Sequence, residues 1–433
     1  MESKFAKFLQ RATEYLTYLF VFILPWQVKL ILKPGETNYS EISLYLFFIL
    51  AIIILILFFW IRLKEKDTDD GCKLTVYSLA FLGLFVFISI LVAPDKLLAL
   101  FHYFVLLTAI SLFFVIRLGV EPRTYKDPLF NKTYIIYSFL LSMFFQSSLG
   151  IYQFLTQSSF AFKYLGLASH NPDTLGTAVV ETINGRWLRA YGGMDHPNIL
   201  GGTLAIALIL VAYMLAKKKM LNTKQQVWSS VLLFVFYFVA LYGIFFTFSR
   251  AAWLALAVGF FTLLIIFIVN KDKWILSRFI ALIFFSAILL VIVAAPFQDL
   301  LMVRLDGDSR LEQKSINERQ SYILQAKDIS QKHFLTGVGI GNYSQAVAVE
   351  DNFKNPAWYY QPVHNVFLLI LSESGFFSLI FFLFFLFFLM KNGRRELYAW
   401  AIFMPLLVLM MVDHWLFSLP YGVFFLFLLF GLI

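Results

Sequence analysis

Long apolar stretches recur along the whole chain and are separated by short polar segments. A helix of about 20 residues is long enough to cross the ~30 Å hydrocarbon layer of a bilayer. In lipid the backbone must satisfy its own hydrogen bonds, so only helices or a closed barrel can span it. The stretches are continuously apolar and do not alternate, which favours helices over a barrel. The pattern therefore predicts an all-α polytopic membrane protein.

The apolar stretches predict about twelve transmembrane helices in one integrated membrane domain. The expected spans are residues 13–32, 42–61, 74–93, 97–116, 133–155, 197–216, 227–248, 250–269, 275–296, 363–390, 397–412 and 414–432. They divide the chain into an N-terminal bundle (1–155), a loop (156–196), four helices (197–296), a second loop (297–362) and three C-terminal helices (363–433).

Charge is scarce, at 14% of the 433 residues, and its net value is +9. Basic residues gather in six short segments on one side of the expected spans: Lys4, Lys7 and Arg11; Arg62, Lys64, Lys66 and Lys73; Arg117, Arg123, Lys126 and Lys132; Lys217, Lys218, Lys219 and Lys224; Lys271, Lys273 and Arg278; Lys391, Arg394 and Arg395. Such loops mark the cytoplasmic side, so we expect both termini in the cytoplasm and no nucleic-acid partner. The start of the chain lacks an obvious cleavage site, so we expect a retained anchor.

The two long loops, 156–196 and 297–362, would then face the outside. Loops of this length are usually functional or disordered. In the second loop, Ser309 and Glu312 have the spacing of a capping box, and an apolar stripe of helical period follows with Arg319 at its edge. We expect a large extracytoplasmic loop with an amphipathic helix that ends before the Gly337–Gly341 run.

One predicted helix start on this outer side follows Arg189 and reads His196-Pro197-Asn198. Pro197 suits the first helical turn, and Asp195 or His196 can cap it. Helix N-termini attract anions through free N–H groups and the helix dipole, and Arg189 adds a guanidinium. The alternative is an ordinary helix start with a surface arginine.

Two further helix starts carry Ser249-Arg250 and His364-Asn365, and Ser249 can cap the first of them. An arginine between two apolar spans is usually functional or paired, although it can also snorkel to lipid headgroups. His364 can transfer a proton near neutral pH, although a histidine here can also pack or cap a helix. Glu373 lies deeper in the same expected span.

The three arginines Arg189, Arg250 and Arg319 would share the outer side. Because a guanidinium binds two phosphate oxygens at once, they predict a site for the diphosphate of a lipid carrier. We find no Gly-rich nucleotide loop and expect no cofactor.

We also expect no metal site. The single cysteine, Cys72, excludes a cysteine-based metal cluster and an intramolecular disulfide, and His196, His364 and His414 lack helical ligand spacing. Asp413-His414 could line the site or simply separate two spans, and we favour the separation.

At these residues the chain resembles the O-antigen ligase and O-antigen polymerase superfamily of bacterial membrane glycosyltransferases. The resemblance is strongest over about residues 185–390, and the first 150 residues match only as generic spans. The residues that carry it are Arg189 with His196-Pro-Asn198, Ser249-Arg250 before Trp253, Arg319 ahead of Gly337-Val-Gly-Ile-Gly341-Asn342, and His364-Asn365 with Leu368, Glu373 and Gly375.

The resemblance implies a glycosyltransferase of the bacterial inner membrane that joins a glycan from undecaprenyl diphosphate to an acceptor hydroxyl on the periplasmic or outer face. We expect an inverting, metal-independent reaction in cell-surface polysaccharide biosynthesis, among membrane lipids. By similarity, Arg189, Arg250 and Arg319 would hold the diphosphate and stabilise its departure, and His364 would activate the acceptor or bind the diphosphate. The expected supporting residues are His196, Asn198, Asn342, Asn365 and Glu373.

The sequence is also compatible with other functions. A ligase would use a lipid A core sugar as acceptor and a polymerase a second carrier-linked repeat, and the sequence fits both. A transporter, either a lipid-linked sugar flippase or a small-anion (bicarbonate-type) carrier, needs polar groups near mid-membrane and access from both faces. The expected spans are nearly free of central charge except at Glu373 and show no broken helices at matched positions, which favours an enzyme. A non-catalytic scaffold is the third alternative.

Overall fold

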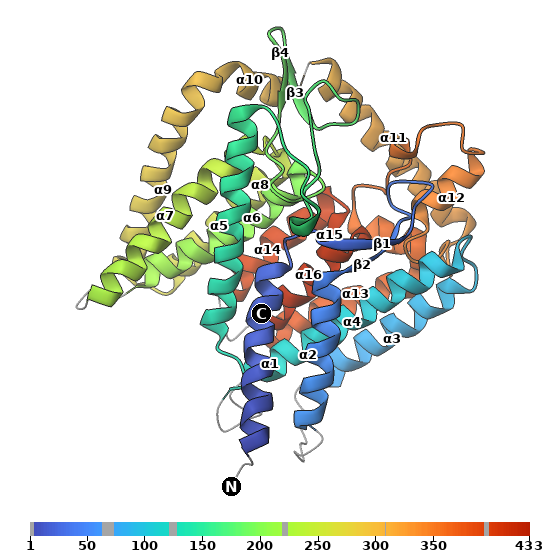
Figure 1. Cartoon of the computed structure of the whole chain (residues 1–433), viewed down its shortest axis with the longest axis horizontal. Helices are drawn as coiled ribbons and strands as arrows, with labels where there is room; N and C mark the ends of the chain where they lie inside the picture. The colour runs from blue at the N-terminus through green and yellow to red at the C-terminus, as the bar shows by residue number, and fades with distance from the viewer. Residues whose placement is uncertain (1–3, 63–72, 121–127, 219–223, 308, 394–397) are drawn as a thin grey trace.

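The computed structural model describes residues 4–62, 73–120, 128–218, 224–307, 309–393 and 398–433, and these residues are mostly helical (Figure 1). Cys72 lies outside the described residues. So do several of the basic residues from which the membrane orientation was predicted: Lys64, Lys66, Arg123, Lys126, Lys219, Arg394 and Arg395.

Each expected span overlaps a helix in the described part of the chain. The helices are α1 (Lys4–Ile23), α2 (Leu46–Arg62), α3 (Lys73–Ile90), α4 (Lys96–Val120), α5 (Lys132–Thr156), α6 (Pro197–Lys217), α7 (Lys224–Phe246), α8 (Arg250–Val269), α9 (Lys273–Ala294), α13 (Val366–Gly393), α14 (Tyr398–Val412), α15 (Trp415–Ser418) and α16 (Pro420–Leu432). Among the described residues, eight helical segments are long and apolar enough to cross a membrane, and α2, α14 and α16 are shorter apolar helices. The chain is therefore a membrane protein.

Two small antiparallel sheets interrupt the helices, which the apolar pattern did not predict. Strand β1 (Lys29–Lys33) occupies the end of the expected span 13–32 and pairs with β2 (Ile42–Tyr45). The helix prediction was wrong there because Pro25 follows α1, and a proline disfavours helical backbone at the residue before it. Strands β3 (Val179–Thr182) and β4 (Gly185–Leu188) form a hairpin in the loop before α6.

The centre of the bundle is α6, which is buried along almost its whole length and contacts α5, α7, α8, α9 and α14. Helix α16 is also buried throughout and packs against α4, while α13 packs against α3. A helix that is apolar all round belongs in such an interior. The N-terminus of α6 is therefore held firmly at one end of the bundle.

The segment after α9 forms an arch over the end of the bundle that is opposite the N-terminus (Figure 1). It contains the short 3-10 helix η2 (Ala295–Phe297), α10 (Gln298–Asp306), α11 (Arg310–Lys332), α12 (Tyr343–Glu350) and η3 (Ala357–Tyr359), and η1 (Lys163–Leu165) lies in the earlier loop. Helix α11 confirms the predicted amphipathic helix. Ser309 caps it through the N–H of Glu312, the stripe residues Tyr322 and Ile329 are buried, and the helix ends before Gly337.

Helix α13 is broken at Gly375, where φ is 79° and ψ is 179°, so the expected span 363–390 is not one continuous helix. The loop after α11 satisfies the backbone at the break. The N–H of Val338 donates to the carbonyl of Ser372 (2.9 Å), and the N–H of Phe376 donates to the carbonyl of Phe334 (2.9 Å). The continuous prediction was wrong because these partners come from a distant segment that local periodicity does not reveal.

We predict that Gly375→Ala destabilises the protein strongly. A Cβ at this position would lie 2.1 Å from the carbonyl oxygen of Leu335, in a backbone conformation open almost only to glycine. The expected loss is on the order of 3 kcal/mol in the free energy of unfolding. Thermal unfolding in detergent measures it. The matched control is Gly307→Ala, because Gly307 has φ +73° with nothing within 4 Å; equal stability of the two variants would contradict the prediction.

Candidate active site

The three helix starts identified in the sequence are each capped by a side chain. His196 caps α6, its Nδ1 accepting from the N–H of Asn198 at 3.1 Å. Ser249 caps α8, its Oγ accepting from the N–H of Ala252 at 3.4 Å. The Oδ1 of Asn365 accepts from the N–H of Leu368 at 2.9 Å at the start of α13. The caps predicted at His196 and Ser249 are confirmed.

A cavity of about 360 Å³ lies beneath the arch, and we call it the arginine cavity. It brings together the starts of α6 and α8 with α10, α11 and the β3–β4 hairpin. The cationic side chains that line it are Arg186, Arg189, Arg250, Arg304, Arg310, Lys314 and Arg319, and its other charged or imidazole groups are His196, Glu312, Glu318 and His364. Arg189, Arg250 and Arg319, which were expected to share one site, all line this cavity.

Arg189 is fixed at the bottom of this cavity and is only 6% exposed. Its Nε donates to the carbonyl of Thr247 at 2.7 Å, and its terminal nitrogen donates to Oδ1 of Asn198 at 2.8 Å. Burial lowers the pKa of Arg189 well below its ordinary value, and the charge of Arg304 acts in the same direction. Because a guanidinium stays protonated in proteins, this is buried positive charge that an anion in the cavity would stabilise.

Glu312 organises two of the arginines and was not recognised as a site residue in the sequence. Its carboxylate is buried and forms ion pairs with Arg304 and with Arg250, the latter at 2.9 Å. Arg304 also donates from Nε to the carbonyl of Phe248 at 2.9 Å. The sequence assigned Glu312 only to the capping box, and Arg304 lies in a short helix without an apolar stripe, so neither gave a distinct signal.

Arg319 differs from these arginines because it has no ion pair or hydrogen bond within the described part of the chain, although it lines the arginine cavity. Its charge lowers the pKa of His364, and it also lowers the pKa of Asp413. Both effects place the Arg319 charge close to these two groups. Arg319 and His364 thus line one cavity, to which Arg319 offers a cation without a partner among the described residues.

A second cavity of about 440 Å³ adjoins the first, and we call it the mixed cavity because polar and aromatic side chains line it together. The residues that line both cavities include His196, Asn198, Trp358, Gln361 and His364. On its other sides the mixed cavity is lined by Tyr39 and Glu41 near β2 and by Asp413 and His414 between α14 and α15. A ligand in either cavity would therefore contact the same shared wall.

His364 lies in that wall among other polar rings. Its ring stacks on Tyr322 at a centroid distance of 5.8 Å and meets His414 edge to face at 4.8 Å. Its Nδ1 is buried and has no hydrogen-bond partner among the described residues. Burial lowers the pKa of His364 below its usual value, and the Asp413 carboxylate opposes this shift only in part. The imidazole is therefore neutral at neutral pH and able to accept a proton.

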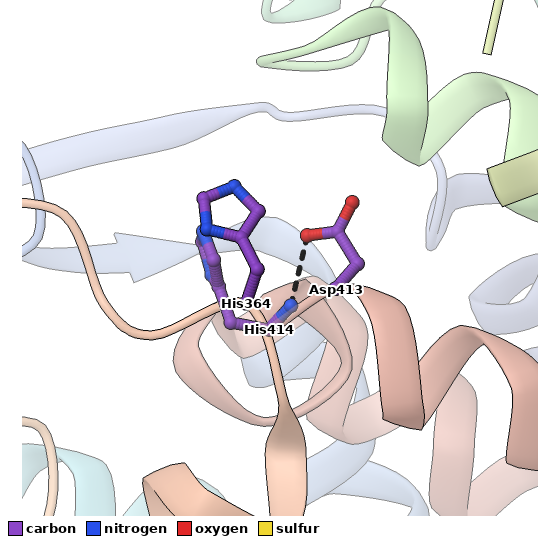
Figure 2. Close-up of side chains that lie close together, drawn as sticks. All are labelled: His364, Asp413 and His414. Atoms are coloured by element: carbon purple, nitrogen blue, oxygen red, sulfur yellow. Dashed lines mark hydrogen bonds between the residues drawn. The ribbon is translucent and has the colours of Figure 1, made fainter. Parts of the chain in front are cut away.

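Asp413 and His414 face His364, as Figure 2 shows, and the hydrogen bond drawn there runs from the His414 N–H to Oδ1 of Asp413. Oδ2 of Asp413 accepts from the Asn198 amide at 3.3 Å, which links it through Asn198 to Arg189. Asp413-His414 does separate α14 from α15, as favoured from the sequence, but the pair also lines the mixed cavity because packing of α14 against α13 brings it to His364.

The same three side chains could hold a metal ion by type and distance, since their ligand atoms lie within 4.8 Å of one another. The helical-spacing argument missed this cluster because its two histidines come from different segments. The nearby charge of Arg319 opposes a bound cation, however, and Ser418 already hydrogen-bonds Nδ1 of His414 at 2.7 Å. The local charge favours an anion over a metal.

Three expected supporting residues lie outside both cavities and hold the fold. Asn342 accepts from the N–H of Asp95 at 2.9 Å and so ties the start of α12 to the α3–α4 connection. Asn365 donates to the carbonyl of Met411 at 3.0 Å. Glu373 is buried and accepts from the N–H of Tyr343 at 3.3 Å. The structure therefore places them in packing roles near the site, while His196 and Asn198 do line it.

Comparison with known proteins agrees with this geometry. Residues 235–383 match a protein-family model described as O-antigen ligase. The matched range contains Arg250, Arg319 and His364, so the resemblance drawn from those residues is confirmed, whereas Arg189 and Asp413 lie outside it. A comparison with curated proteins finds no match. The family match supports an O-antigen ligase-like function in general.

Proposed function

We propose that this chain, with its O-antigen ligase match over residues 235–383, moves a glycan from undecaprenyl diphosphate to an acceptor hydroxyl. The observation that carries the proposal is the meeting of an arginine-lined cavity and a mixed polar and aromatic cavity at His364. In this proposal the site faces the outside of the bacterial inner membrane, and both termini are cytoplasmic.

The donor diphosphate would occupy the arginine cavity. Arg189, Arg250 and Arg319 come from three separate elements, so they can contact different phosphate oxygens. As the bond between the sugar and the diphosphate breaks, negative charge grows on the leaving oxygen, and preorganised guanidinium groups stabilise it. The arginines therefore act both in donor binding and in departure of the leaving group.

The acceptor sugar would occupy the mixed cavity, with its hydroxyl at His364. The hydroxyl oxygen attacks the anomeric carbon while the carbon–oxygen bond to the diphosphate breaks, and the bonding electrons leave with the diphosphate. The imidazole of His364 takes the hydroxyl proton. Because acceptor and diphosphate lie on opposite sides of the anomeric carbon, the configuration inverts. Asp413 would stabilise the imidazolium that forms.

As the pH is lowered, kcat/KM for transfer is expected to fall only below pH 6.5. A base must be neutral, and burial lowers the pKa of His364 from 6.5, so the neutral form persists as pH falls until that lowered pKa is reached. Asp413 and His414 face the imidazole from the α14–α15 connection and Arg319 from α11. Measuring kcat/KM from about pH 4.5 to pH 8 locates this fall for the free enzyme. A midpoint at or above 6.5 would rule out this role.

Chelators are expected to leave transfer unchanged. In the proposed step, guanidinium groups stabilise the leaving diphosphate, a role that a divalent cation can fill in other enzymes. The step therefore needs no metal. Activity of purified protein is compared before and after EDTA treatment and dialysis, with added Mg²⁺ or Zn²⁺ as a further arm. Loss of transfer that only a metal restores would show that the His364–Asp413–His414 cluster binds a catalytic ion.

The proposed function is tested by reconstitution. Purified protein in proteoliposomes receives a labelled undecaprenyl-diphosphate-linked repeat and either a lipid A core acceptor or a second carrier-linked repeat. Gel mobility of the labelled product reports transfer, and the productive acceptor separates ligase from polymerase. Donor binding without transfer to either acceptor would overturn the glycosyltransferase proposal.

Transport is the second candidate, and the break in α13 at Gly375 is a feature of the described residues that favours it. Yet the break is occupied by the loop after α11, and the buried Glu373 beside it accepts a backbone N–H of α12. Because of these contacts, the break in α13 is a packed junction with the loop after α11. In the same proteoliposomes, movement of the labelled donor between leaflets without product would favour a flippase.

A further inference from the structure

The arginine cavity carries more positive charge than a diphosphate needs. Seven cationic side chains line it against the two carboxylates of Glu312 and Glu318, and Glu181 pairs with one of the cations from just outside. Among the described residues this leaves about four positive charges uncompensated. A diphosphate that links a lipid to a sugar carries about two negative charges, so the cavity can accept further anionic groups.

The cations that line the cavity differ in how exposed they are. Arg189 and Arg304 are 6% and 9% exposed at the bottom. The side chains of Arg310 and Lys314, at the start of α11, are 73% and 51% exposed. The cations thus extend from the buried floor to solvent, and the two exposed ones are already paired, Arg310 with Glu181 and Lys314 with Glu318.

Arg186 also lines the arginine cavity and has no ion-pair partner within the described part of the chain. It lies on β4 directly opposite Glu181 on β3, but Glu181 instead accepts two hydrogen bonds from Arg310, at 3.0 and 3.1 Å. The Nε of Arg186 is buried and has no hydrogen-bond partner among the described residues. Buried donors are nearly always satisfied in folded proteins, so this N–H indicates a missing acceptor.

The position of Arg186 favours a saccharide over a lipid headgroup as its ligand. The β3–β4 hairpin projects beyond the helix ends, on the side opposite the N-terminus (Figure 1), and Ile183 at its tip is fully exposed. A lipid headgroup would lie level with the ends of the apolar helices. The part of the donor that extends past the diphosphate is its glycan, and Trp358 in the shared wall offers a ring on which a sugar can stack.

We propose that the donor glycan is acidic and that Arg186 binds a carboxylate of a uronic-acid sugar within it. The inference rests on the proposed function, because it takes the arginine cavity as the donor site. A charge-assisted hydrogen bond from a partly buried guanidinium corresponds to about a tenfold or greater preference for the acidic donor.

The test compares two synthetic donors, undecaprenyl diphosphates whose disaccharide is either two glucuronic acids or two glucoses. Equilibrium binding is measured by competition with a fluorescent donor in phosphatidylcholine vesicles, so transfer is not required. Wild type is expected to prefer the acidic donor about tenfold, and Arg186→Ala is expected to reduce that ratio to about one. Arg186→Glu should reverse the preference. Folding of each variant is checked by size exclusion and thermal unfolding.

The control variant is Arg278→Ala, which removes the same charge from α9 beside Lys218, at the far end of α6. It should retain the tenfold ratio. Equal binding of both donors to wild type, or an unchanged ratio in Arg186→Ala, would overturn the inference. If Arg186 instead binds a lipid headgroup, adding phosphatidylglycerol would affect both donors equally, and this too would overturn it. Binding of neither donor would instead overturn the proposed function.

Discussion

Replacement of His364 by alanine is expected to reduce kcat for glycan transfer by between about a hundredfold and ten-thousandfold. The imidazole is the proposed base at the junction of the two cavities, and alanine offers no proton acceptor there. Donor binding should change little, since the arginines remain in place. Product formation from labelled donor in proteoliposomes measures kcat, and competition binding measures affinity for the donor.

His333→Ala is the matched control for that experiment. His333 belongs to the long loop that precedes His364, but it is an exposed residue at the end of α11, and neither cavity includes it. Its removal should leave transfer unchanged. If His364→Ala binds the donor much more weakly and keeps its turnover at saturating donor, the histidine contacts the diphosphate and another group is the base.

Arg250→Ala is expected to lower kcat/KM by about a hundredfold or more, the usual effect of removing one preorganised donor from a developing anion. The variant should still fold, because Glu312 remains paired with Arg304 when Arg250 is absent. Arg250→Lys should recover only part of the loss, since an ammonium cannot bind two phosphate oxygens as a planar fork does. Transfer rates over a range of donor concentrations give both constants.

Arg278→Ala serves again as the control for charge alone, because Arg278 is distant from both cavities and donates to the carbonyl of Lys218. Its kcat/KM should match that of wild type. Full recovery of activity in Arg250→Lys would show that only charge matters at this position and would contradict bidentate phosphate binding.

Much of the fold could be predicted because helices that cross a lipid bilayer need long apolar stretches, which are easy to recognise in a sequence. Each expected span overlaps a helix, and the caps at His196, Ser249 and Ser309 follow from local side-chain chemistry. The β1–β2 pairing was missed because an apolar run of strand length looks like the end of a span. The break at Gly375 was missed because its hydrogen-bond partners lie in the loop after α11.

Candidate site residues could be recognised in the sequence where a single residue departed from the positive-inside rule. They were missed where they act with partners from distant segments. Arg189, Arg250, Arg319 and His364 stood out because cations and histidine are scarce on the expected outer side. Nothing local distinguished Asp413, whose role depends on contacts with Asn198, 215 positions earlier. In the same way, Glu312 gave only a capping signal, although its carboxylate holds two arginines.

The central claim is that the arginine cavity binds a polyprenyl diphosphate, and a structure of the protein in nanodiscs with undecaprenyl-diphosphate-linked sugar tests it most directly. The account predicts two phosphate densities within hydrogen-bond distance of Arg189, Arg250 and Arg319, with the first sugar directed toward His364. Phosphate density elsewhere on the protein, with the arginine cavity empty at saturating donor, would contradict it.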